Sequence, residues 1–378
     1  MAQLEEKLKS CFEWFHRHPE LSYEEYATTA KIKEILAQEG VEILPLPLKT
    51  GLVAIVRGGS QGPVQALRCD IDALPVTEET GLSYASKYQG KMHACGHDFH
   101  ITAGIGCALL LNEKKEGLAG CVKIIFQPAE ETSLGALKIL ETDVMEDVGK
   151  IWGIHADPTN EVGTIGIREG YVTAAVDRFV VNIKGTGCHG AHPDDGIDPI
   201  PAAAAVVQAF QTIVTRNVNA FHPALISVTR IQAGNTWNVI PDRAVLEGTV
   251  RTMDKQDRVL FEKRVEEIAK STAAAYGAEA DVEWIAGAPA TYNDGEMAEK
   301  AIQAAGQWGF LVVPEESSMG GDDFSFLEEK IPGCYIKVGT GRGQLIHQPG
   351  FCVDERVILP AAKYLAALIG GVPCREGK

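Results

Sequence analysis

The chain has 378 residues and is acidic, with 51 Asp and Glu against 35 Lys and Arg and a formal net charge of −16. This length predicts about two domains and a core large enough to fold without disulfide bonds. The negative charge argues against nucleic acid as a partner, because phosphate binding needs a basic surface, and against an anionic membrane.

The cysteines and the N-terminal segment predict a cytoplasmic protein. The 9 cysteines are odd in number and scattered, unlike a disulfide framework. The first ten residues, MAQLEEKLKS, lack the charged-then-apolar order of a signal peptide. No apolar run in the sequence reaches membrane-spanning length.

The first part of the chain alternates between helical and strand-like patterns. One helix is predicted over residues 4–17, and a second is predicted to run to Gly40 after a capping box formed by Ser22 and Glu25. Apolar runs predict four strands, at residues 53–56, 64–67, 122–126 and 151–154. A helix is predicted between the second and the third strand, at residues 101–112. Such alternation predicts an α/β domain whose mostly parallel sheet is covered by helices on both faces.

The pattern changes after about Val176. The next elements are predicted in the order strand, helix, strand, strand, helix, strand, at residues 178–184, 199–215, 224–232, 244–251, 255–276 and 280–284. This βαββαβ order is typical of a small ferredoxin-like α+β sandwich. The chain then returns to helix, strand and helix from about Met297. We therefore predict that residues 177–286 are inserted into a domain formed by residues 1–176 and 287–378.

Polar clusters follow four of the predicted strands directly. They begin at Arg68, Gln127, His155 and Gly339. Because ligands of open parallel sheets bind beyond the carboxyl ends of the strands, four such clusters predict a site at that edge.

A fifth polar cluster, residues 92–100, precedes the predicted helix that follows the second strand. Cys95 and His97 flank a glycine there, so their side chains can converge on one point, and a helix N-terminus favours the thiolate. Cysteine, histidine and carboxylate together suit zinc or another first-row divalent ion better than magnesium or calcium.

Each residue of these clusters also has a structural interpretation. Alone, His155 would more often be a hydrogen-bonded histidine, Cys95 a core residue, and the Glu130-Glu131 pair a solvated helix start. Asp70 and Asp72 alone could be turn or cap residues. The conjunction favours a metal site. Three further histidines have no evident partners and are interpreted as structural: His16, His18 and His222.

Two short motifs match catalytic patterns in the wrong context. Residues 58–62 fit the G-x-S-x-G nucleophile elbow, but Pro63 and another strand follow instead of a helix, which favours a hairpin turn. Residues 185–190 fit G-x-G-x-x-G, but a dinucleotide site needs a helix there and an acidic residue about twenty positions on, and neither is predicted.

Taken together, the motifs resemble the aminoacylase and carboxypeptidase G family of co-catalytic metal hydrolases. The resemblance is greatest to the branch of indole-acetyl-amino-acid (IAA-amino-acid) hydrolases, hippurate hydrolases and bacterial N-acetyl-amino-acid deacetylases. The matching stretches span most of the chain: HPELS at 18–22, DIDALP at 70–75, HACGHD at 93–98, QPAEE at 127–131, GIH at 153–155, NVIPD at 238–242, GGDDF at 320–324 and IH at 346–347.

The resemblance implies a metallopeptidase-like fold with two divalent metal ions per chain, and Cys95 as the ligand that bridges them. Zinc or manganese is favoured, and cobalt or nickel also suits such a donor set. The implied metal ligands are Cys95, His97, Glu131, His155 and His347.

The resemblance also implies roles for four further residues. Glu130 would be the general base, and Asp72 would orient a ligand histidine. His189 and Asn238, both on the inserted domain, would stabilise the oxyanion and contact the substrate. In the family that domain acts as a lid and builds a homodimer.

Three positions depart from the family pattern. Cys69 replaces a small residue before the first aspartate, and Asp322 stands where this branch commonly carries glutamate. Two histidines compete for the lid role, of which the alignment favours His189 over His192.

We expect hydrolysis of the amide bond of an N-acyl-L-amino acid to a carboxylate and a free amino acid. Acetyl, benzoyl and arylacetyl substrates all fit the sequence. One alternative is a metal-independent amidohydrolase with Cys95 as nucleophile and His97 as base, which would leave His155 and His347 without a role. Another is a metal-dependent binding protein without catalysis, which the presence of Glu130 disfavours.

Overall fold

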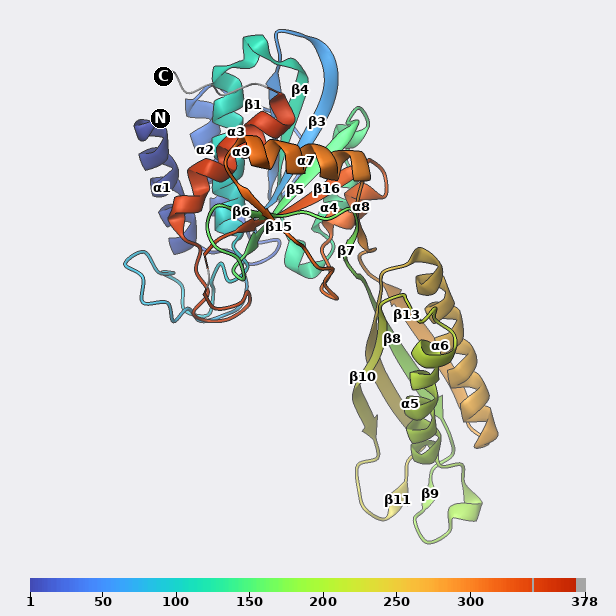
Figure 1. The fold of residues 1–378 in the computed structure, drawn as a ribbon. Coiled ribbons are helices and arrows are strands. Elements are labelled where there is room, and N and C mark those ends of the chain that lie inside the picture. Colours follow the sequence, from blue (N-terminus) through green and yellow to red (C-terminus); the bar gives the residue numbers. More distant parts are fainter. Residues whose placement is uncertain (342, 372–378) are drawn as a thin grey trace. The chain divides into compact units, whose positions relative to one another are not determined.

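The structure is a computed structural model that describes residues 1–341 and 343–371 (Figure 1). The chain forms two compact units. The second unit comprises Thr173–Thr291 and Ser317–Gly321, and the first comprises Met1–Val172, Tyr292–Glu316 and the segment from Asp322 onward. Among the described residues, no helix has the length and apolar character needed to span a membrane.

An eight-stranded sheet forms the centre of the first unit, in the order β1-β2-β4-β3-β5-β16-β6-β15. The four adjacent strands β4, β3, β5 and β16 are parallel, so their carboxyl ends meet at one edge. The strands are β1 (Glu42–Ile43), β2 (Leu52–Arg57), β3 (Ser60–Asp70), β4 (Ala119–Gln127), β5 (Lys150–Asp157), β6 (Thr164–Gly166), β15 (Leu311–Val313) and β16 (Gly333–Gly339). Two short strands, β7 (Gly170–Thr173) and β14 (Thr291–Asn293), form a separate sheet.

Helices cover both faces of this sheet (Figure 1). The larger core lies under α1 (Ala2–Arg17), α2 (Tyr26–Gln38), α3 (His97–Glu113), α7 (Gly295–Gln307) and α9 (Ile358–Gly370). The smaller core lies under α4 (Gly135–Leu140) and α8 (Phe324–Glu328). Side chains alternate between the cores along β2, where Leu52 and Ala54 face the larger core and Val53 the smaller. The predicted mostly parallel α/β sheet is confirmed.

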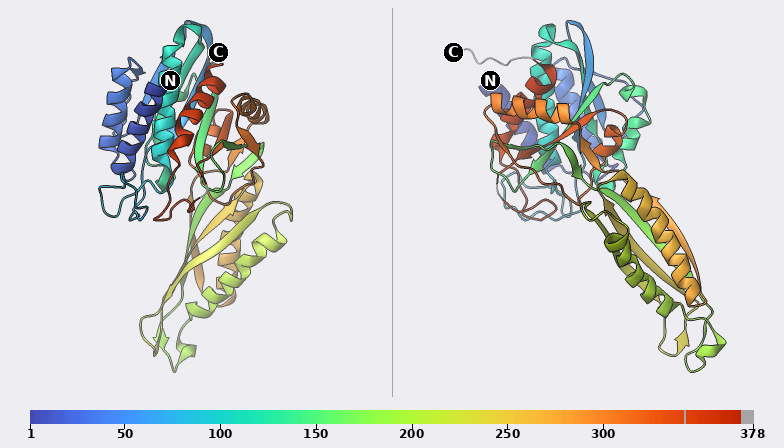
Figure 2. Two further views of the ribbon diagram at one scale, coloured as in Figure 1. Left: turned by 60° about the vertical axis from the view of Figure 1, so that its left-hand side comes forward. Right: turned by 45° about the vertical axis from the view of Figure 1, so that its right-hand side comes forward.

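The second unit is an antiparallel sheet with two helices on one face (Figure 2). Its strands lie in the order β10-β12-β8-β13, and its chain order is βαββαβ, as predicted. Asp254 caps α6 by accepting the backbone N–H groups of Gln256 and Asp257. The elements are β8 (Ala175–Lys184), α5 (Pro199–Arg216), β10 (Ala224–Ala233), β12 (Arg243–Thr252), α6 (Lys255–Ala275) and β13 (Glu279–Ala286), with a small sheet of β9 (Cys188–His189) and β11 (Val239–Ile240).

The predicted capping box at the start of the second helix is wrong. Helix α2 begins at Tyr26 and has no side-chain cap from its N-cap residue Glu25. Its first backbone N–H groups, from Ala27 and Thr28, are accepted instead by the carboxylate of Glu20 at 3.1 and 2.8 Å. Ser22 and Glu25 are therefore free to make contacts elsewhere.

The predicted hairpin turn at residues 58–62 is also wrong. Strands β2 and β3 do not pair, because β4 lies between them, antiparallel to β2 and parallel to β3. The connection differs from a nucleophile elbow as well, since it leads into a strand. At residues 185–190 the chain enters strand β9, and the next helix, α5, begins only at Pro199.

Candidate metal centre

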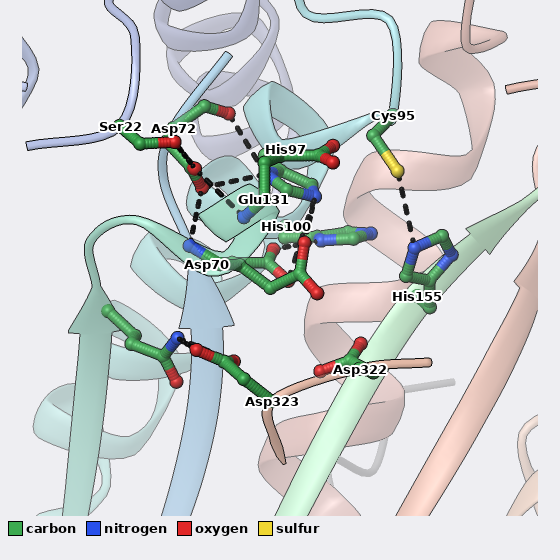
Figure 3. Close-up of polar contacts among 12 residues, drawn as sticks. Ser22, Asp70, Asp72, Cys95, His97, His100, Glu131, His155, Asp322 and Asp323 are labelled. Atoms are coloured by element: carbon green, nitrogen blue, oxygen red, sulfur yellow. Dashed lines mark hydrogen bonds and ion pairs between the residues drawn. The ribbon is translucent and has the colours of Figure 1, made fainter. Parts of the chain in front are cut away.

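The polar clusters converge at the carboxyl edge of the parallel strands (Figure 3). Asp70 ends β3, His155 lies near the end of β5, and His97 begins α3. Several groups of three side chains place one ligand atom each within 4.8 Å of one another. Two of these groups share Cys95: Cys95 with His97 and His155, and Cys95 with Glu131 and His347.

In their neutral forms, two histidines direct the lone pair of Nε2 toward this space. His97 donates its Nδ1–H to the backbone carbonyl of Asp72 at 2.9 Å, and His155 donates its Nδ1–H to that of Ala156 at 2.8 Å. A carbonyl only accepts, so the lone pair of each neutral ring lies on Nε2. The Nε2 atom of His97 is buried without a hydrogen-bond partner, and that of His155 lies 3.5 Å from the Cys95 sulfur. This is the tautomer and orientation that a metal ligand requires.

Glu131 and His347 complete the donor set on the more exposed side. The Oε1 atom of Glu131 is buried without a hydrogen-bond partner and lies 3.5 Å from Nε2 of His347. His347 has a left-handed backbone with φ 66°, and its N–H donates to the Ala94 carbonyl at 2.7 Å. An exposed histidine held in this conformation indicates a functional constraint on the backbone. The donors therefore fit divalent metal.

Burial shapes the protonation of these groups. Burial lowers the pKa of His155 to about 3, which keeps the ring neutral. Burial raises the pKa of the Cys95 thiol, although the neighbouring rings of His347 and His97 oppose this. A bound cation would favour the thiolate. The pKa of Glu130 is raised well above its usual value, first by burial and then by the carboxylates of Asp322 and its neighbour Asp323.

Asp72 connects the proposed ligands to the proposed base. Its carboxylate accepts the Ser22 hydroxyl at 2.7 Å and the backbone N–H groups of Glu130 and Glu131, both at 3.1 Å. Its Oδ1 also lies 3.3 Å from Nδ1 of His97. One buried side chain thus orients a histidine and two consecutive glutamates. The contact with Ser22 was not predicted from the sequence.

His189 and Asn238 lie together on the second unit. Strand β9 pairs with β11 so that His189 is opposite Val239, and the Gly190 N–H donates to the Asn238 carbonyl at 2.8 Å. The His189 side chain is exposed, and its Nδ1 accepts the Ala191 N–H at 3.1 Å. In the neutral ring the proton is therefore on Nε2, which leaves a donor facing outward.

Comparisons with known proteins identify the family of this chain. The model of peptidase family M20/M25/M40 matches residues 66–370. The chain belongs to this family.

Several M20 relatives are similar over nearly their whole length. An N-acetylcysteine deacetylase of Bacillus subtilis is 47% identical to this chain, and the match covers 93% of both chains. An N-acetyl-L-cysteine deacetylase of the same organism is 44% identical, and the match covers 97% of this chain and 88% of the relative. A solved Bacillus subtilis structure, described as a dinuclear metal-binding peptidase of the M20 family, has a TM-score of 0.90 at 44% identity and 98% coverage of both chains. The family confirms the predicted class, a metal-dependent hydrolase of linear amides.

Beside the candidate metal ligands, this M20 chain buries a charged network that was not predicted from the sequence. His100 pairs through Nδ1 with Asp70 and accepts the Ala156 N–H on Nε2 at 2.8 Å. Arg68 is fully buried and forms ion pairs with three aspartates: Asp70, Asp322 at 3.1 Å and Asp323 at 2.7 Å. The spacing of His97 and His100, three residues apart on one helix, was the available signal.

Proposed function

We propose that the protein hydrolyses the amide bond of N-acyl-L-amino acids, with release of a carboxylate and a free amino acid. The observation that carries the proposal is the buried Nε2 of His97, which has no hydrogen-bond partner, is grouped with Cys95 and lies 3.9 Å from the carboxylate of Glu130. The names of two relatives make N-acetyl-L-cysteine the first substrate to test. Benzoyl and arylacetyl conjugates belong in the same test.

We propose five metal ligands for two divalent ions: Cys95, His97, Glu131, His155 and His347. Two groups of donor atoms that share Cys95 support a bridging thiolate. Zinc or manganese suits these donors best, and cobalt or nickel is compatible with them. Bound ions would polarise the scissile carbonyl and lower the pKa of the attacking water toward about 7.

Glu130 is the proposed general base. It takes a proton from the attacking water and later gives it to the leaving amine, so one carboxylate serves as base and then as acid. Its raised pKa, caused by burial and by the Asp322 and Asp323 carboxylates, suits a group that must hold a proton between these two steps. Asp72 positions both Glu130 and the ligand His97.

His189 and Asn238 are the proposed substrate contacts from residues 177–286, which we propose to act as a lid. The outward-facing Nε2–H of His189 supports its role as a donor to the oxyanion. We further propose that this domain forms a homodimer. The edge position of β10 and the 56% exposure of Ile231 on that strand support this assembly.

Metal content and amine release test the proposal together. We expect about two divalent ions per chain by elemental analysis, and turnover on N-acetyl-L-cysteine that chelation abolishes and added metal restores. Glu130→Gln should keep the metal and lose more than 99% of the turnover, whereas Glu113→Gln, at the exposed end of α3, should keep both. Turnover by metal-free protein would favour Cys95 as nucleophile. A metal-loaded chain inactive on every conjugate would favour a binding protein.

A further inference from the structure

The residue before the proposed base has an unusual backbone conformation. Ala129 has φ 55° and ψ 40°, in the left-handed region, and joins the end of β4 to the short helix η2 (Glu130–Thr132). A residue with a Cβ atom rarely adopts this conformation unless its surroundings impose it. Ala129 is fully buried. Because Glu130 follows directly, the Ala129 torsions set the direction in which Glu130 leaves the strand.

A carboxylate from a distant part of the chain holds this residue. Oε1 of Glu25 accepts the Ala129 N–H at 2.8 Å across 104 positions in sequence. Glu25 is the N-cap residue of α2 and is fully buried, yet it does not cap that helix. Glu20 accepts the first N–H groups of α2 in its place. The Glu25 side chain is thereby available to the loop.

We propose that Glu25 is a positioning residue for Glu130, through the left-handed backbone of Ala129. The inference rests on the proposed role of Glu130 as base. Three successive N–H groups, at residues 129, 130 and 131, are accepted by only two carboxylates, those of Glu25 and Asp72. Because these carboxylates come from the start of α2 and from the segment directly after β3, two separate parts of the chain fix the loop.

The role of Glu25 differs from that of Asp72. Asp72 also contacts the proposed ligand His97, whereas Glu25 meets the loop at the Ala129 N–H. Loss of Glu25 should therefore misplace the base while the metal ligands stay together. A purely structural role would lower the unfolding temperature and leave kcat of the folded enzyme unchanged.

Three substitutions separate geometry from charge. Glu25→Gln keeps an oxygen that can accept the Ala129 N–H and should keep kcat within about fivefold of the original, because the hydrogen bond survives. Glu25→Asp keeps the carboxyl group but is one methylene shorter, and Glu25→Ala removes the acceptor. We expect kcat to fall in the order Gln, Asp, Ala, and the alanine variant to lose roughly 100-fold, as misplacement of a catalytic group can cause. Metal content and KM should change little.

A fourth substitution tests the backbone directly. Glycine adopts the left-handed region readily, so Ala129→Gly should restore kcat at least tenfold when added to Glu25→Ala. Glu24→Gln, at the exposed neighbouring position, is the matched control. A Glu25→Asp variant more active than Glu25→Gln, or a double variant without rescue, would overturn the proposal.

Crystal structures of the variants keep this test independent of the proposed function. If the unsubstituted enzyme turned over no conjugate, the role of Glu130 would fail, but the torsions of residue 129 would still report on its anchor. We expect Ala129 to leave the left-handed region in Glu25→Ala and residue 129 to return to it in the double variant. If Glu25→Ala does not fold, Glu25→Asp gives the same reading. If Ala129 stays in the left-handed region in Glu25→Ala, or in Glu25→Asp where that variant replaces it, the proposed role of Glu25 is refuted.

Discussion

Oδ1 of Asp72 accepts the backbone N–H of Glu130 at 3.1 Å. The same carboxylate faces His97, so its removal should disturb the proposed base and a proposed ligand together. We expect Asp72→Ala to reduce metal affinity and kcat/KM by roughly 10- to 100-fold each, as is usual when a partner of a metal ligand is lost. Metal titration and steady-state kinetics measure the two effects.

Ser22→Ala is the graded control for Asp72. It removes one hydrogen bond from the carboxylate and leaves the two loop contacts in place. A single hydrogen bond contributes about 0.5–1.5 kcal/mol, so activity should fall by no more than about tenfold. A Ser22→Ala variant as impaired as Asp72→Ala would show that the hydroxyl itself acts in the site.

Cys95 should be protected from alkylation by bound metal. Its side chain is 5% exposed, and its sulfur belongs to two groups of potential metal ligands. In chelated protein, iodoacetamide should label Cys95 slowly, and metal should suppress that labelling because a coordinated sulfur is a poor nucleophile. Peptide mass spectrometry measures both, with exposed Cys352 as the internal control that labels in either state. Alkylation that abolishes a chelator-resistant activity would instead support the cysteine mechanism.

The sequence predicted the sheet and the edge at which the polar clusters meet because both follow from local patterns. Apolar runs located β3, β4 and β5, and parallel strands bring their carboxyl ends to one edge. The capping box failed because Ser22 and Glu25 have partners 50 and 104 positions away. A local pattern cannot show such partners, so the two residues seemed to serve only the nearby helix.

His16 shows the same limit and carries a prediction on stability. The sequence shows no partner for this histidine, yet its Nδ1 lies 2.7 Å from Asp98 and its Nε2 lies 3.1 Å from Glu78. Burial opposes the charge on His16, but the two carboxylates prevail and raise its pKa to about 9. Because this value exceeds the ordinary 6.5, the stabilisation is complete below about pH 6.5 and is lost as the pH rises through about 9.

Urea unfolding of the metal-saturated protein between pH 6 and pH 9.5 measures this loss. The free energy of unfolding should fall by an amount on the order of 3 kcal/mol across the interval through His16. His16→Gln cannot bind the extra proton, so its curve should be lower at pH 6 and flatter up to pH 9.5. Parallel curves for the two proteins would mean that His16 is not the group responsible.

His189 and His192 should differ sharply when each is replaced by glutamine. The Nδ1 atom of His189 accepts the Ala191 N–H, which leaves Nε2–H of the exposed neutral ring as the proposed donor to the oxyanion. Loss of one such donor costs about 3–4 kcal/mol in the barrier, so kcat of His189→Gln should fall roughly 100- to 1,000-fold with metal content unchanged. His192 lies next to it, with ring centroids 5.4 Å apart, and is the matched control. We expect His192→Gln to keep kcat within about threefold, because it leaves that donor in place. A loss of kcat in His192→Gln but not in His189→Gln would assign the oxyanion donor to His192. If neither variant lost kcat, neither histidine would act in the mechanism.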